Sequence, residues 1–279
     1  MTADAIAAAS LLPASMPAGT AVLGPEPASL GLEGRMEATV TGATKPAWHR
    51  PFRPGSFFGR GGGDPYARAL RRRHGILDLI DADADPRAEP LARYDAGAWF
   101  HATPGERALL GTLTGPVLDI GCGPGRFVAA ARRAGIDAVG IDVEERAVRL
   151  ARRGGEAVLG SVFHPCAEIT STGRAGAGWG GVLLMDGNIG IGGDPAALLA
   201  RVREITAPGA SVWVEAATGP WTDRSFAARL RDARGHLSDE FPWAVLGPAA
   251  LAATAADTGW DPVTQRSLSG RPVCLLRRR

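Results

Sequence analysis

The sequence predicts an α/β protein built on a Rossmann-like, doubly wound sheet that is mostly parallel and includes a C-terminal antiparallel strand. Three observations lead to this fold class. Segments typical of strands and helices alternate between residues 117 and 216, the first strand-like segment runs into a turn with three glycines, and two further strand-like segments close the chain. Alternation favours a parallel sheet, because parallel strands are joined by crossover helices that cover both faces.

Each predicted element has a local signal. Short apolar runs predict strands, whereas polar caps, a proline in the first turn and a closing glycine mark helices. Asp194 followed by Pro195 is the clearest helix start. The predicted strands are 117–121, 138–142, 157–163, 180–186, 207–216, 262–268 and 271–277, and the predicted helices are 127–135, 144–155, 194–206 and 247–260.

Three regions follow from the composition along the chain. Residues 1–45 are rich in Ala, Pro, Gly, Ser and Thr without apolar periodicity, which is typical of a disordered leader. Residues 46–93 are expected to form a linker and an N-terminal helical segment that opens at Asp64-Pro65, although the aromatic residues within 46–58 also allow docking. Residues 94–279 form the main domain, with a substrate-side insert at 217–246 that is expected to cap the site or to form two antiparallel strands.

Composition argues against several classes of protein. The 279 residues carry a formal net charge of +2, so no charge excess would recruit nucleic acid or an anionic membrane. Cys122, Cys166 and Cys274 are odd in number and lack metal-site spacing, which argues against a disulfide framework and a structural metal. The N-terminal region lacks the basic residues of a secretory signal, and no uncharged apolar run reaches membrane-spanning length. We therefore expect a cytoplasmic protein.

The glycine-rich turn after the first strand predicts a cofactor site. Glycine permits backbone conformations and close approaches that a Cβ would block, and ligands of doubly wound sheets lie at such turns. The glycines are Gly121, Gly123 and Gly125. The dinucleotide fingerprint G-x-G-x-x-G is not completed, because its third glycine would fall on Arg126 or Val128. A dinucleotide is therefore the less favoured ligand.

An acidic residue inside the same strand sharpens the choice of ligand. Asp119 lies two residues before the turn, where a buried carboxylate needs a hydrogen-bond donor and would repel a phosphate. A ligand with an ammonium group and no phosphate removes this objection. The pattern D-x-G-C-G-x-G closely resembles motif I of the class I S-adenosylmethionine-dependent methyltransferases, and the resemblance extends from about Tyr94 to the C-terminus.

The resemblance implies S-adenosyl-L-methionine as the cofactor and gives roles to individual residues. It implies that Asp119 helps to hold the methionine moiety, that Asp142 binds the ribose hydroxyls, and that the segment 161–163 surrounds the adenine. Cys122 is expected to pack rather than to act as a nucleophile. The implied cofactor-binding residues are Asp119, Gly121, Cys122, Gly123, Gly125, Asp142, Val143, Ser161, Val162 and Phe163.

The sequence identifies fewer residues that would contact the methyl acceptor. Asp186 and Asn188 follow the fourth strand, where the family brings substrate and methyl donor together, although both residue types also cap turns. Asp186 and His164 are the candidate bases. Trp99 and Trp243 are expected at the mouth of the crevice, where core packing is their alternative role. The fourth strand lacks an NPPY-like signature, which favours a small-molecule acceptor over nucleic acid or protein.

The sequence leaves two alternative functions open. A nicotinamide-dependent oxidoreductase would share the fold, but it needs a hydride-handling pair such as Tyr-Lys. Tyr66 and Tyr94, the only tyrosines, both precede the glycine turn, and Lys45 is the only lysine. A cofactor-binding scaffold without turnover is the other alternative, since no obvious base stands out. Methyl transfer itself needs mainly alignment and exclusion of water, so no universal catalytic residue is expected.

Overall fold

Two β-sheets organise the part of the chain that the computed structural model describes, residues 56–164, 169 and 178–279. All of these residues belong to one unit, residues 45–279. The expected leader 1–45 lies outside the described residues, as do Trp48 and Phe52 of the aromatic segment. None of the described helices is both long and apolar enough to cross a bilayer.

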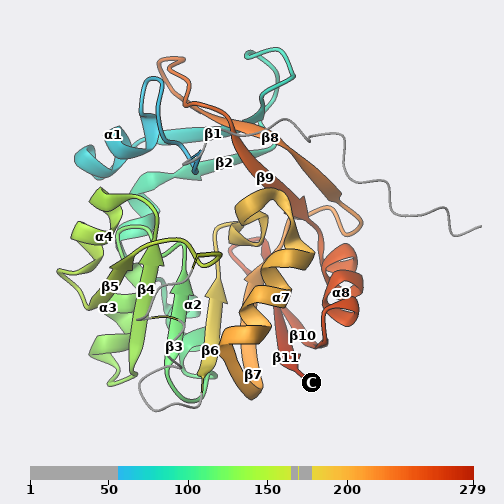
Figure 1. The fold of residues 1–279 in the computed structure, drawn as a ribbon. Helices are drawn as coiled ribbons and strands as arrows, with labels where there is room; N and C mark the ends of the chain where they lie inside the picture. Colours follow the sequence, from blue (N-terminus) through green and yellow to red (C-terminus); the bar gives the residue numbers. More distant parts are fainter. Residues whose placement is uncertain (1–55, 165–168, 170–177) are drawn as a thin grey trace, which may run out of the picture. The chain divides into compact units, whose positions relative to one another are not determined.

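The larger sheet has seven strands in the order β10-β11-β7-β6-β3-β4-β5 (Figure 1). Strands β5, β4, β3, β6 and β7 are parallel, and β11 runs antiparallel between β7 and β10. The strands are β3 Val117–Ile120, β4 Ala138–Asp142, β5 Glu156–Leu159, β6 Trp179–Leu184, β7 Thr206–Glu215, β10 Trp260–Leu268 and β11 Arg271–Arg278. The predicted fold class is confirmed. The chain order reverses between β3 and β6, which opens a crevice at their carboxyl ends.

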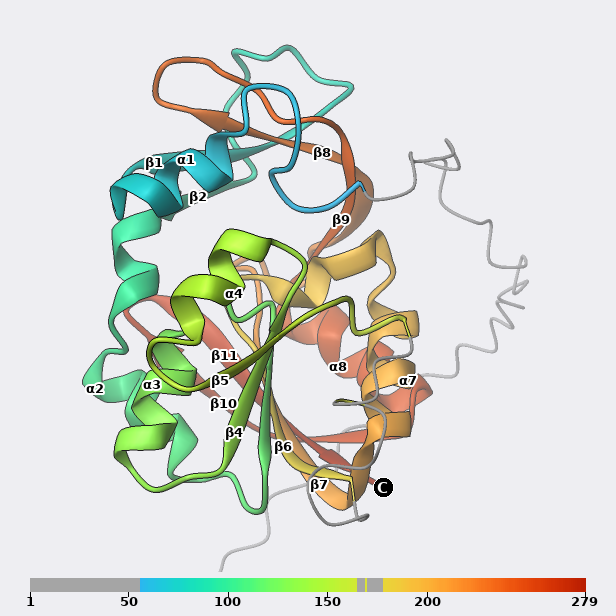
Figure 2. The ribbon, with the colours of Figure 1, turned by 60° about the vertical axis from the view of Figure 1, so that its left-hand side comes forward.

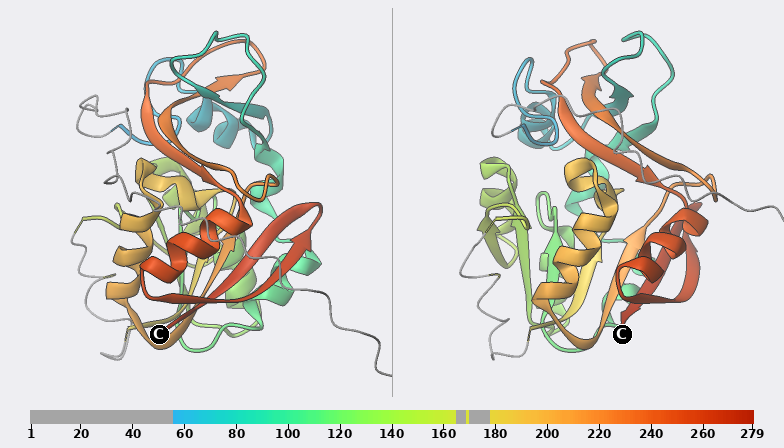
Figure 3. Two further views of the ribbon diagram at one scale, coloured as in Figure 1. Left: turned by 90° about the vertical axis from the view of Figure 1, so that its right-hand side faces the viewer. Right: turned by 45° about the vertical axis from the view of Figure 1, so that its right-hand side comes forward.

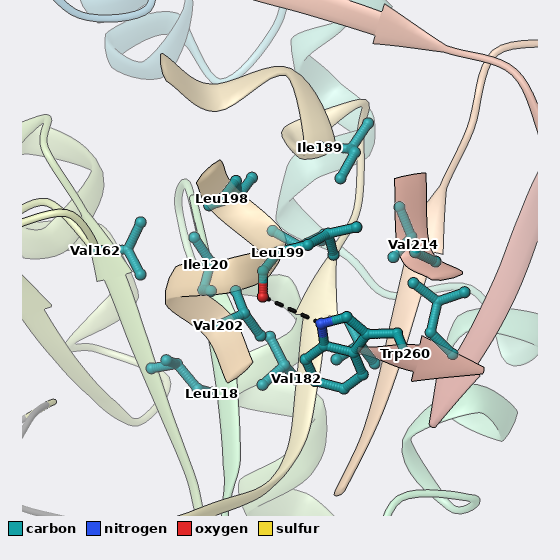
Figure 4. Packing of buried hydrophobic residues seen from close by; sticks show 14 of the residues in the cluster. Leu118, Ile120, Val162, Val182, Ile189, Leu198, Leu199, Val202, Val214 and Trp260 are labelled. Atoms are coloured by element: carbon teal, nitrogen blue, oxygen red, sulfur yellow. Dashed lines mark hydrogen bonds between the residues drawn. The ribbon is translucent and has the colours of Figure 1, made fainter. Parts of the chain in front are cut away.

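Helices cover both faces of this sheet (Figure 3). One face carries α2 Pro104–Leu110, α3 Arg126–Arg133 and α4 Glu145–Ala151, and the other carries α7 Pro195–Ile205 and α8 Pro248–Asp257. Leu118 and Ile120 of β3 face α7, where the buried Trp260 indole donates a hydrogen bond to the Leu199 carbonyl at 3.1 Å (Figure 4). Side chains alternate along a strand, so Val117 and Asp119 point to the α3 side.

A second, four-stranded antiparallel sheet lies across the carboxyl ends of the first (Figures 1 and 2). Its order is β2-β1-β8-β9, with β1 Ile76–Asp81, β2 Ala92–Asp95, β8 Asp223–Asp232 and β9 Phe241–Leu246. Helix α1, Pro65–Arg72, packs against it. The segment 217–246 therefore does supply two antiparallel strands, and their partners come from residues 46–93, expected to be linker and helix.

Several element boundaries differ from the expected ones for local reasons. Between β2 and β3 the chain forms a 3₁₀ turn, Ala96–Phe100, and the separate helix α2. Thr103 and Glu106 form a reciprocal capping box that starts α2, because each side chain accepts the other residue's backbone N–H. Strand β5 ends at Leu159, so the segment 161–163 lies in the loop that follows it.

Candidate active site

A cavity lies where the second sheet covers the carboxyl ends of β3 and β4. Its floor is the glycine turn 121–124 together with Asp142 and Val143, and one side is formed by residues 160–164. The roof consists of aromatic side chains from the second sheet and the segments that support it. These are Phe58, Tyr66, Tyr94, Trp99 and Trp243. An apolar cavity with a few convergent polar groups is the usual form of a small-molecule site.

The three glycines of the turn are required for different reasons. All have positive φ, +71° at Gly121, +54° at Gly123 and +88° at Gly125. A Cβ at Gly121 would lie 2.5 Å from Nδ2 of Asn188, and one at Gly125 would lie 2.7 Å from Cα of Ala151. At Gly123 the nearest atom would be the Tyr66 hydroxyl at 3.6 Å. Only Gly123 therefore leaves its open side to a ligand, whereas the other two make room for the protein itself.

Asp142 ends β4 with its carboxylate held by the backbone. One oxygen accepts the Gly123 N–H at 2.8 Å and the other accepts the Glu144 N–H at 2.8 Å. Burial raises the pKa of Asp142 to about 6, although these backbone hydrogen bonds lower it. Each carboxylate oxygen keeps a second lone pair, so two hydroxyl donors of a ligand can still be bound.

One carboxylate oxygen of Asp119 is buried without a hydrogen-bond donor in the described part of the chain. Its side chain is 3 % exposed, and Oδ2 has no hydrogen-bond partner among the described residues. Burial raises its pKa to about 7, while the charge of Arg126 lowers it. A buried polar group without a partner costs free energy. A ligand with an ammonium group, or water held by one, would supply the missing donor.

Asp186, a candidate base from the sequence, is held in an ion pair. Its two oxygens accept from the Arg126 guanidinium at 2.6 and 3.0 Å, and Arg271 adds a contact at 3.3 Å. Its backbone is in the left-handed region, with φ of 56°. Guanidinium groups engage both oxygens of this carboxylate, so the geometry favours a positioning role over the expected role as a base.

Arg126 is the centre of a buried charge network that the sequence did not indicate. Its guanidinium also donates to Glu106 at 3.0 and 3.2 Å, and Arg271 bonds to Glu215 at 2.8 Å. Burial, followed by the charge of Asp186, raises the pKa of Glu215 to about 7. Three carboxylates thus share two guanidinium groups, which leaves one negative charge in excess when all are ionised.

Asn188 and His164, predicted from the sequence, both line the cavity. The Asn188 amide donates to the carbonyls of Ile120 and Gly121 at 2.8 and 3.1 Å, so it fixes the start of the glycine turn. His164 is exposed at the edge of the cavity. His164 therefore stays a candidate proton acceptor on the basis of its position.

The other predicted residues divide between cavity and core. Cys122 packs against buried apolar side chains of α3 and α4, and burial raises the pKa of its thiol, which agrees with a packing role. Val162 is buried, whereas Phe163 lies at the surface with 36 % exposure. The Ser161 hydroxyl accepts the Phe163 N–H at 3.3 Å. Trp99 and Trp243 lie in the cavity roof and are at the same time core residues.

Phe58, Tyr66 and Tyr94 complete the roof and were missed as site residues. Phe58 contacts both tyrosines edge-to-face, with ring centroids 5.3 and 5.9 Å apart. The sequence favoured a linker for residues 46–58 and left docking open as the alternative, and of these residues Phe58 lies in the roof. Nothing local showed that the chain's two tyrosines face one cavity, because they reach it from α1 and β2.

Comparisons with known proteins agree with this geometry. A family model described as a methyltransferase domain matches residues 117–209, which hold the glycine turn and Asp142. The chain is 27% identical over 175 residues, 59% of its length, to a ubiquinone biosynthesis O-methyltransferase of Bordetella avium, of which the match covers 70%. Residues 117–209 therefore form a methyltransferase domain of the class I, S-adenosylmethionine-dependent type. The oxidoreductase and the scaffold without turnover are thereby set aside.

A solved methyltransferase shows the same fold. The structure of an S-adenosylmethionine-dependent methyltransferase from Bacteroides fragilis, in complex with S-adenosyl-L-homocysteine, aligns with a TM-score of 0.59. The alignment covers 82% of this chain and 98% of that one at 18% identity. The residues of the cavity fit the cofactor of the family, because Asp119 lacks a donor that an ammonium group supplies and Gly123 leaves space above the turn.

The raised pKa values predict that the methyltransferase binds S-adenosylmethionine more weakly in acid. In the roles that the family resemblance implies, ionised Asp119 and Asp142 would favour the cationic cofactor and accept its hydroxyl groups, so binding would lower their pKa values and release protons. With pKa values of about 7 and 6 in the free protein, affinity should fall by about 10- to 100-fold from pH 8 to pH 5.5. Calorimetry in buffers of different ionisation enthalpy measures the affinity and the protons released. An affinity independent of pH would contradict the assignment, and Asp119→Asn should flatten the profile.

Proposed function

We propose that this enzyme transfers the methyl group of S-adenosylmethionine to a small-molecule acceptor inside the covered cavity. The observation that carries the proposal is the aromatic roof, which the chain itself places over the glycine turn. Strands β1, β2, β8 and β9 carry this roof over the turn, which favours a small acceptor over a folded protein or a duplex. The Bordetella avium relative, by its name an O-methyltransferase of ubiquinone biosynthesis, also supports a small acceptor.

The residues around the cavity would hold the cofactor in a defined way. Asp142 would bind the ribose hydroxyls with its free lone pairs, and Asp119 would receive the donor that it lacks from the methionine moiety. The segment 161–163 would lie beside the adenine. The cofactor supplies a sulfonium methyl group that is already activated for in-line displacement. The protein's remaining task is to align the acceptor and exclude water, which an apolar roof performs.

The expectations about partners and location are proposals as well. We infer that the acceptor diffuses in as a free small molecule and that neither nucleic acid nor a membrane is the substrate. A cytoplasmic location is supported by Cys122 and Cys274, both free thiols in the described structure.

Replacing Asp142 by alanine tests the cofactor site. The variant should bind S-adenosyl-L-homocysteine about 10- to 100-fold more weakly, because two ribose hydrogen bonds worth about 1–3 kcal/mol in sum are lost. Isothermal titration calorimetry measures the change. Asp257→Ala, which removes an exposed carboxylate at the end of α8, is the matched control and should bind like the parent protein. An unchanged affinity of the Asp142 variant would refute the ribose role.

A further inference from the structure

The roof of the cavity is a cluster of aromatic rings that come from separate parts of the chain. Phe58 is its centre, with ring centroids 5.1 Å from Trp243, 5.3 Å from Tyr66 and 5.9 Å from Tyr94. Trp99 lies 5.6 Å from Tyr66 and 6.0 Å from Tyr94. Several of these pairs are edge-to-face, so rings lie in different planes around the cavity.

The two tyrosines in this cluster keep their protons. Burial, followed by the charge of Asp142, raises the pKa of Tyr66, and burial followed by the charge of Asp186 raises that of Tyr94. Neutral phenols present electron-rich faces and hydroxyl groups rather than negative charge. The Tyr66 hydroxyl faces the glycine turn at Gly123, where the cofactor is proposed to lie.

In the part of the chain that the structure describes, two carboxylates and one guanidinium group line the same cavity, so acidic side chains are in excess. Asp186 lines it and belongs to the network in which three carboxylates share two guanidinium groups. Arg126 is the only arginine or lysine among the described lining residues, and Glu106 and Asp186 already engage its guanidinium. The described lining therefore offers no uncommitted guanidinium or ammonium group to an anionic acceptor.

We propose that the methyl acceptor is a small amine that binds as a cation between the aromatic roof and the Asp186 carboxylate. Its nitrogen would first release one proton to solvent, and its lone pair would then take the methyl group as the bond from that group to sulfur breaks. Aromatic faces attract cations most strongly where water is excluded, and the Asp186 carboxylate in the cavity lining acts in the same direction. A carboxylate or phosphate on the acceptor would meet Asp186 without a free counter-charge. This inference rests on the proposed function and adds the chemical class of the acceptor.

Three probes of similar size and different charge test the proposal on the protein saturated with S-adenosyl-L-homocysteine. They are phenethylamine, 2-phenylethanol and 3-phenylpropanoate, titrated at pH 7 and low salt with calorimetry or tryptophan fluorescence as the readout. Phenethylamine should bind at least tenfold more tightly than the alcohol, and the carboxylate should bind most weakly. Equal affinities, or tightest binding of the alcohol or the carboxylate, would overturn the proposal.

A substitution in the network gives an independent readout. Asp186→Asn removes one carboxylate charge from the cavity lining and should weaken phenethylamine at least fivefold without changing the affinity for 2-phenylethanol. Glu204→Gln, on the exposed face of α7, is the control and should leave all three affinities unchanged. A preference for the amine that survives in Asp186→Asn would overturn the role of this carboxylate. If that variant does not fold, the ranking of the probes on the parent protein still decides.

Titration with S-adenosyl-L-homocysteine distinguishes failure of the proposed function from failure of the cationic acceptor. Failure to bind S-adenosyl-L-homocysteine would refute the proposed function itself. Normal binding of this product together with a preference for 3-phenylpropanoate would refute only the cationic acceptor.

Discussion

Arg126→Met is expected to lower the free energy of unfolding by about 3–5 kcal/mol, because it leaves buried carboxylates without a counter-charge. The Arg126 side chain is 5% exposed, and its partners Glu106 and Asp186 are 3% and 19% exposed. Methionine fills similar space and keeps helix propensity, so the change isolates the charge. Urea denaturation followed by circular dichroism measures the loss.

A second substitution distinguishes charge from packing at Arg126. Adding Glu106→Gln removes one of the orphaned charges and keeps the capping interaction with Thr103, so it should recover part of the lost stability. Arg133→Met, an exposed position on the same helix, should change stability by about 0.5 kcal/mol at most. Full stability of Arg126→Met would show that the network contributes nothing to the fold.

Gly125→Ala is expected to destabilise the enzyme by about 2–5 kcal/mol, whereas Gly123→Ala should mainly weaken cofactor binding. At Gly125 the left-handed backbone costs about 1–2 kcal/mol for a residue with a Cβ. The overlap of that Cβ with Ala151 of α4, at 2.7 Å, adds about 1–3 kcal/mol. At Gly123 the backbone cost is similar, but the Cβ points into the cavity and its nearest neighbour lies 3.6 Å away.

The pair of alanine variants serves as its own control. Thermal unfolding should place Gly123→Ala well above Gly125→Ala in Tm, and calorimetry should show that Gly123→Ala binds S-adenosyl-L-homocysteine about tenfold more weakly than the parent protein. Equal losses of stability in the two variants would contradict the separate reasons given for these glycines. Unchanged binding by Gly123→Ala would show that the cofactor does not approach the turn there.

The central sheet could be predicted from the sequence because its signals are local. Asp194 and Pro195 predict the start of α7, and the Asp194 side chain does accept the Ala197 N–H at 2.9 Å. The glycine turn joins β3 to α3 as expected, with Asp142 at the end of the neighbouring strand. Caps, glycines and apolar runs each act over a few residues, so a single sequence contains them.

The second sheet and the charge network could not be predicted in this way, because their partners are distant in sequence. The apolar residues of ILDLID, residues 76–81, are compatible with a strand, but its partner β8 is distant in sequence, since Leu79 pairs with Leu230. In the sequence, Arg126 occupies the position of the third glycine of the dinucleotide fingerprint, and no role was predicted for its side chain. Its partners lie 20 and 60 residues away, and no local rule brings Glu106 and Asp186 to one guanidinium.

The wide separation of the segments that make the roof has a consequence for synthesis of the enzyme on the ribosome. Strands β1 and β2 emerge early, but β8 and β9, which complete their sheet, follow only after the parallel part of the large sheet has been made. Until residue 246 leaves the exit tunnel, the nascent chain exposes the apolar side chains of β1 and α1 to chaperones and proteases. The acceptor chamber is thus completed among the last steps of folding, and a chain released before β9 would lack it.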